Sequence, residues 1–156
     1  MEYNRATICQ NGHVISKYEA NSQEFCSICG ARSYSTCPHC NATIHGTVEM
    51  RGIAFIGSIP YDRPNYCYSC GAAYPWTEMT LNNAVELVAL DDELDEVSKD
   101  LIKNAIPDLI ADSPTTPVAV SKCRKGLLRA GDALKNALYN LLIDVLSDTA
   151  KKMLFP

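Results

Sequence analysis

The sequence predicts an α+β protein, in which a cysteine-rich module of short β-hairpins and knuckles (residues 1–76) precedes a C-terminal helical hairpin or bundle (residues 77–156). Two observations predict this division. Seven of the eight cysteines come before residue 71, where short strand-like stretches alternate with Gly, Asn and Pro turn signals. After residue 76 the apolar residues recur every three or four positions, which is typical of one face of a helix.

Four pairs of residues in the N-terminal module have the spacing of metal ligands. They are Cys9 and His13, Cys26 and Cys29, Cys37 and Cys40, and Cys67 and Cys70. Three of these pairs are Cys-x-x-Cys turns, and each such turn places two thiolates at two corners of a tetrahedron around Zn²⁺. Because a structural zinc ion takes four ligands, eight ligands make two closed sites. We therefore expect a double zinc ribbon that binds two Zn²⁺ ions per chain.

Other uses of the cysteines fit this pattern less well. Disulfides need an oxidising compartment, of which the sequence gives no sign, and a redox Cys-x-x-Cys usually occurs once, beside a βαβ pattern. Four cysteines can also hold an iron–sulfur cluster. An imidazole in one ligand set and the ribbon-like spacing favour zinc instead.

The first ligand set and the pairing of the sets rest on the local turns. His13 is assigned as a ligand because it follows Cys9 across an Asn-Gly turn that folds the chain back. His45 is the alternative fourth ligand, whereas His39 is expected to point outward. The pairs combine either sequentially, first with second and third with fourth, or interleaved in a cross-brace. We favour sequential pairing because it needs only local hairpins and costs less loop-closure entropy.

Three helices are predicted in the C-terminal module, over about residues 77–90, 92–106 and 118–154. Pro107 should end or kink the second helix. Within the third, apolar or small residues follow the 4-3-4-3-4 spacing of a seam that packs along another helix: Leu127, Gly131, Leu134, Leu138, Leu141 and Val145. Cys123 is expected to be a half-buried, small apolar residue, and the alternative is a thiol whose pKa is lowered by basic neighbours.

The order of the motifs along the chain is also informative. They run Cys-x-Asn-Gly-His, Phe-Cys-x-x-Cys-Gly, Cys-Pro-x-Cys, Tyr-Cys-x-x-Cys-Gly-x-x-Tyr-Pro-Trp-Thr and Ser-Pro-x-Thr-Pro-Val-Ala-Val. This order resembles a family of small bacterial proteins, a domain of unknown function with zinc-ribbon knuckles, over residues 8–77 and about 113–152. The resemblance implies a bacterial or phage origin and a zinc-bound N-terminal half, and it implies no particular activity.

Composition and motifs argue against two classes of function. The formal net charge of −4 disfavours a nucleic-acid binder that relies on contacts to backbone phosphates, although interleaved Arg and aromatic residues keep a zinc-ribbon nucleic-acid binder as an alternative. No phosphate-binding loop, His-Glu-x-x-His pair or nucleophile elbow is present. Since closed zinc sites leave no position for a substrate, we expect neither an enzyme nor a small-molecule substrate.

The remaining interpretation is a non-catalytic protein-interaction or assembly module. Residues 77–112 carry a net charge of −8 and residues 113–156 one of +4, so the acidic segment could cover the apolar seam within one chain or between two. We expect a homo-oligomer or a protein partner that docks through the C-terminal helices. A further alternative is membrane-surface association through Leu138–Phe155, which Asp144 and Asp148 oppose. The sequence shows neither a secretory signal nor a transmembrane stretch, which predicts a cytoplasmic location.

Overall fold

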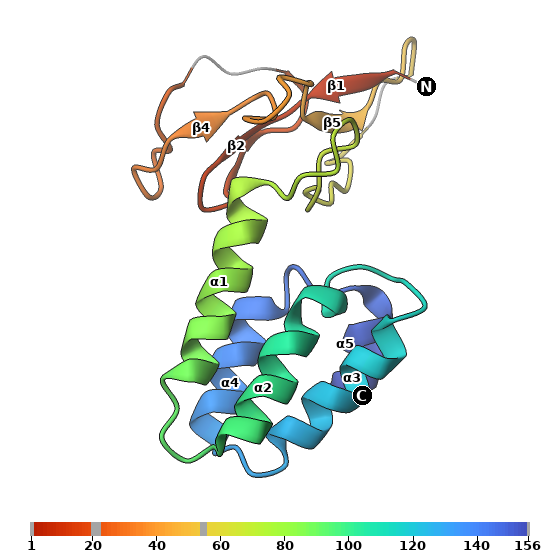
Figure 1. The fold of residues 1–156 in the computed structure, drawn as a ribbon. Coiled ribbons are helices and arrows are strands. Elements are labelled where there is room, and N and C mark those ends of the chain that lie inside the picture. The colour runs from red at the N-terminus through yellow and green to blue at the C-terminus, as the bar shows by residue number, and fades with distance from the viewer. Residues whose placement is uncertain (1, 20–22, 54–55, 156) are drawn as a thin grey trace. The chain divides into compact units, whose positions relative to one another are not determined.

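The computed structural model describes residues 2–19, 23–53 and 56–155, and the chain forms two compact units, Met1–Glu78 and Met79–Pro156. Strands lie in the first unit and most of the helical residues in the second (Figure 1). The predicted α+β class is therefore confirmed. Among the described residues, none of the helices combines the length and apolar composition that crossing a bilayer requires.

The N-terminal unit contains two small antiparallel sheets. Strand β1 (Tyr3–Arg5) pairs with β5 (His45–Val48), and β2 (Thr7–Cys9) lies between β3 (Val14–Ser16) and β4 (Ser33–Tyr34). Each strand has only two to four residues. Strands this short are marginal by themselves, because an isolated hairpin buries too little surface to be stable.

A small core joins these sheets to the end of the unit. Its buried members are Ala6, Ile8, Cys37, Ile44, Cys67, Tyr74 and Trp76. The rings of Tyr74 and Trp76 stack with their centroids 4.7 Å apart. The indole N–H of Trp76 donates to the Pro64 carbonyl at 2.9 Å, so this buried polar group is satisfied. Two of the seven core residues are cysteines, which places metal-ligand candidates inside the hydrophobic core.

The first two helices begin and end near their predicted positions. Helix α1 spans Pro75–Ala89, and its proline occupies the first helical position, where the missing N–H costs nothing. Helix α2 spans Glu96–Ala105 and starts later than predicted, because the Asp95 side chain caps it by accepting from the Ser98 N–H at 2.7 Å. The 3₁₀ helix η1 follows over Ile106–Leu109 and contains Pro107.

The single long helix predicted over 118–154 is wrong. The segment forms three helices instead, α3 (Thr116–Leu127), α4 (Asp132–Leu142) and α5 (Asp148–Leu154). Gly131 takes an extended conformation as the N-cap of α4. Ser147 caps α5 by accepting from the Ala150 N–H at 3.2 Å, and its own N–H donates to the Leu109 carbonyl. These caps stop one helix and start the next.

The breaks let the predicted seam fold onto the rest of its own unit. Leu134, Leu138 and Val145 are buried in a core that also contains Ile102 from α2 and Leu109 from η1. Leu127 and Leu141 are partly buried against this core. Helices α2 and α3 pack against each other, and an exposed Arg129–Asp95 pair of 3.4 Å links the basic segment to the acidic one. Most of the seam is therefore covered within the chain.

Gly126 allows the close approach of α2 and α3. A methyl group at this position would lie 2.5 Å from Ile102 Cγ1 and 2.8 Å from the Ser98 carbonyl oxygen. Both distances are shorter than van der Waals contact, and the carbonyl belongs to the backbone of α2. The helices would have to move apart to accept a side chain.

We predict that Gly126→Ala lowers the unfolding free energy by about 1–3 kcal/mol, the usual cost of overpacking a core. Ser121→Ala, an exposed change in the same helix, should stay within about 0.5 kcal/mol of the parent chain. Urea denaturation followed by circular dichroism at 222 nm would measure both. Equal stability of the Gly126→Ala chain and its parent would contradict the close packing of α2 on α3.

Candidate metal centres

Two groups of four side chains in the N-terminal unit could each hold a metal ion. The first contains Cys9, His13, Cys26 and Cys29, and the second Cys37, Cys40, Cys67 and Cys70. Within each group the ligand atoms lie within 4.8 Å of one another. All eight predicted ligands are thus brought together, and the grouping is the sequential one rather than the cross-brace.

Three of the four ligand pairs share one turn geometry. In each Cys-x-x-Cys turn the residue after the second cysteine, Gly30, Asn41 or Gly71, has φ between 61° and 73° and donates its N–H to the carbonyl of the first cysteine. An alanine follows in every case, and its carbonyl accepts the N–H of that first cysteine. The first cysteine of each turn is buried and the second is exposed. The three turns are repeats of one knuckle.

A different turn presents the first pair. Cys9 ends strand β2, and Gly12, with φ of 89°, donates its N–H to the Cys9 carbonyl at 2.8 Å. The turn brings His13 Nδ1 to 3.5 Å from Cys9 Sγ and 3.8 Å from Cys26 Sγ. The φ of Gly12 favours glycine, and a Cβ at this position would also displace the Arg63 guanidinium, which donates to the Gly12 carbonyl.

Backbone and side-chain N–H groups point at several of the sulfurs. The His13 N–H lies 3.3 Å from Cys9 Sγ, the Ser69 N–H lies 3.4 Å from Cys67 Sγ, and Asn11 Nδ2 lies 3.4 Å from Cys29 Sγ. Such donors stabilise a thiolate more than a thiol. The Ala31 backbone N–H is the largest influence on Cys29 and lowers its pKa to about 6.

In the second group, the first thiolate to form opposes the ionisation of the neighbouring sulfurs. Burial disfavours the Cys67 thiolate, but the Cys70 and Ser69 N–H groups outweigh it and lower the pKa to about 6. At Cys70 the Ala72 N–H favours the thiolate, yet desolvation and three neighbouring sulfurs raise the pKa to about 12. One thiolate thus forms easily and hinders the others. A bound cation would remove this conflict, because metal binding deprotonates coordinating thiols.

The other sulfur and imidazole side chains lie outside both groups. His45 is sandwiched between Tyr3 and Tyr68, with ring centroids 4.2 and 4.0 Å away, and is not an alternative ligand. His39 is exposed. Cys123 is buried in the helical core, where desolvation raises its pKa to about 11. The Cys123 thiol therefore lacks the lowered pKa that basic neighbours would produce.

Sequence reasoning missed two contributors to these sites. Asn41 takes the left-handed conformation that glycine takes in the other two knuckles, and the Cys-x-x-Cys-[Gly/Asn]-Ala repeat would have revealed it. Arg63, which braces the Gly12 carbonyl of the first ligand turn, lies 51 residues further along the chain. No local pattern signals that contact.

Comparison with known proteins assigns the chain to one group. A family described as an uncharacterized protein conserved in bacteria (DUF2321) matches residues 2–154. Neither the curated proteins nor the solved structures contain a match.

We predict that Cys67→Ser removes one metal ion per chain, whereas Cys123→Ser leaves the metal content unchanged. The first change deletes a ligand of the second group, and the second alters a residue of the helical core. Elemental analysis of the gel-filtered proteins would count the ions. Circular dichroism of the same samples would show whether the helical unit stays folded. An equal loss of metal in both variants would contradict the grouping.

Proposed function

The chain belongs to this family of proteins conserved in bacteria, and on that premise we propose that it is a non-catalytic, zinc-binding interaction protein. In this proposal two structural Zn²⁺ ions hold the N-terminal unit rigid, and side chains displayed on its knuckles bind another protein.

The spacing of the sulfurs supports zinc as the metal. Cys9–Cys29, Cys37–Cys70 and Cys40–Cys67 have Sγ–Sγ distances of 3.7, 3.8 and 3.6 Å. A tetrahedral ion with Zn–S bonds of about 2.3 Å separates its sulfurs by about 3.8 Å. A disulfide would need about 2.05 Å. In an iron–sulfur cluster four thiolates are divided among two or four iron atoms, so some of them lie farther apart than the 4.8 Å within which each whole group falls here.

The number of protein ligands in each group is the observation that indicates structural rather than catalytic zinc sites. Each group supplies four donors of the types found in structural sites, three thiolates with an imidazole or four thiolates. Catalytic zinc usually has three protein ligands and a water molecule in the fourth position. When bound, each ion would join two turns that are distant in sequence, such as Cys37–Cys40 and Cys67–Cys70. It would not activate a substrate.

Exposed apolar side chains on the knuckles support protein binding. Phe25 and Ile28 flank ligands of the first group and are 58% and 73% exposed, and Tyr68, between ligands of the second group, is 61% exposed. Aromatic side chains are enriched in protein interfaces and supply much of their affinity. Rigid aromatic groups also lose little conformational entropy when they bind.

The ring stack of Tyr3, His45 and Tyr68 favours a nucleic-acid interface, since bases stack on exposed rings. The stack itself already occupies both faces of His45 and one face of each tyrosine. Residues 1–76 contain five basic and five acidic residues, and the two zinc sites would add formal charges of −1 and −2 from their thiolates. Phosphates would meet a negatively charged unit, so we rank this function second.

The C-terminal helices offer weaker support for membrane binding and for self-association. Membrane-surface binding through Leu138–Phe155 would need a continuous apolar face, but Leu138, Leu142 and Leu146 are buried in the helical core. Self-association was expected because the apolar seam between Leu127 and Val145 has to be buried against another surface. Since most of the seam is covered within the chain, a homo-oligomer is no longer needed to bury it, and we place the partner on the knuckles.

We predict that native mass spectrometry finds two Zn²⁺ ions per chain. Chelation should unfold the N-terminal unit while helical circular dichroism largely persists, because zinc supplies roughly 10–16 kcal/mol of binding free energy per site in small zinc domains. Iron in place of zinc, or one ion per chain, would contradict the proposed sites. Simultaneous loss of all structure on chelation would contradict the independence of the two units.

The protein-binding proposal can be tested by affinity capture from the native host with quantitative mass spectrometry. We predict that a partner captured by the parent chain is lost with the double variant Phe25→Ser, Ile28→Ser. It should be retained with Val97→Ser, a matched control in the helical unit whose side chain is 72% exposed. Unchanged zinc content in the variants shows that the ribbon is intact. A partner lost only with Val97→Ser would move the interface to the helices, and capture of nucleic acid alone would favour the second function.

A further inference from the structure

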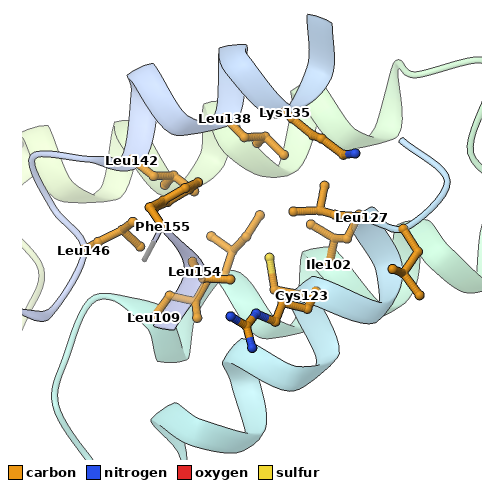
Figure 2. A pocket seen from close by; sticks show the side chains of 13 residues that line it. Ile102, Leu109, Cys123, Leu127, Lys135, Leu138, Leu142, Leu146, Leu154 and Phe155 are labelled. Atoms are coloured by element: carbon orange, nitrogen blue, oxygen red, sulfur yellow. The ribbon is translucent and has the colours of Figure 1, made fainter. Parts of the chain in front are cut away.

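The C-terminal unit contains a cavity of about 500 Å³ that the proposed function does not use. Its walls come from α2, η1, α3, α4 and α5, and Figure 2 shows their side chains around an open centre. A ligand pocket for a small molecule typically has a volume of about 300–1,000 Å³ and a mostly apolar lining. The cavity has the size of such a pocket.

Most of the lining is buried and apolar. Leu138, Leu142 and Leu146 line the α4 side and the segment after it, and Ile102 and Leu109 line the opposite side. The Cys123 sulfur points into the same space (Figure 2). At the rim the apolar side chains are open to solvent, with Leu128 78% and Phe155 42% exposed. The cavity is therefore continuous with an exposed apolar entrance.

The only charged side chains among the lining residues are cationic. Arg124 and Lys135 line the cavity, and no carboxylate from the described residues (2–19, 23–53 and 56–155) does. This contrasts with the unit as a whole, because residues 79–156 hold nine basic and twelve acidic residues, a net charge of −3. Arg124 donates to the Met153 carbonyl. Lys135 is exposed and forms none of the ion pairs found among the described residues.

We propose that this cavity binds one fatty-acid molecule, with the alkyl chain against the leucines and the carboxylate beside Lys135. An apolar space with a few fixed polar groups at its edge is the general design of a site for an amphipathic ligand. A methylene group takes up roughly the volume of one water molecule, about 30 Å³, so the cavity accommodates at most about 16 chain carbons. Dodecanoate is a suitable length.

A second copy of the chain fits the same surface less well. A two-fold symmetric contact through this face would place the Arg124 and Lys135 side chains of one copy near those of the other, and like charges brought together disfavour association. The leucines line a recess, which a slender apolar group enters more readily than a flat surface does. The proposal is independent of the zinc sites, which lie in the other unit.

The test is isothermal titration of the zinc-loaded full chain with dodecanoate, and separately with dodecanol as the uncharged probe, below their aggregation limits. We expect one saturable site for dodecanoate. Lys135→Glu should weaken dodecanoate binding about three- to tenfold and leave dodecanol unchanged, because only the carboxylate contacts the lysine. Lys125→Glu, an exposed change outside the lining, is the matched control and should affect neither probe. Leu127→Trp should block both by filling part of the cavity that Leu127 lines.

The outcomes separate the proposal from its competitors. The absence of saturable binding to a folded chain would overturn it. So would dodecanoate binding that Lys135→Glu does not change, or that Lys125→Glu weakens equally. Sedimentation of the parent chain as a dimer that Leu127→Trp dissociates would assign the cavity to a second copy, and would also overturn it.

Discussion

We propose that the N-terminal unit depends on the attraction between a metal ion and the thiolates of each ligand group. Its strands have only two to four residues, and its core is small, so hydrophobic burial alone supplies little stability. Packed thiols also oppose one another's ionisation, as the raised pKa of Cys70 shows. A bound divalent ion would reverse this repulsion and would join turns that are distant in sequence. In this proposal the ion fixes the knuckles and the side chains displayed on them.

The ligand sets could be predicted because their geometry is local. A Cys-x-x-Cys turn fixes two donors within four residues, and the Asn-Gly turn fixes Cys9 beside His13. Sequential grouping followed from the lower cost of closing shorter loops. The two contributors that were missed differ in kind. Asn41 replaces glycine within a recognisable repeat, whereas the contact of Arg63 with Gly12 depends on tertiary structure that local patterns do not encode.

The helical unit was harder to predict, because the apolar spacing from Leu127 to Val145 continues across the break between α3 and α4 and past the end of α4. Gly131 and Ser147 carry the competing signals, an extended glycine and a serine cap. Both were present in the sequence but were outweighed by the apolar period. The helix breaks also affect the expected function, because three short helices can cover Leu134 and Leu138 within the chain. A single long helix would have needed a second molecule, and the expectation of self-association depended on it.

The central claim is that both metal centres are closed, four-coordinate and structural. X-ray absorption spectroscopy at the zinc edge tests it most directly, because it reports the atoms bound to the metal. With seven cysteines and one histidine shared between two ions, we predict an average of 3.5 sulfur and 0.5 nitrogen ligands per zinc at single-ion distances. An oxygen ligand in the first coordination shell, or scattering from a second metal atom nearby, would contradict the account.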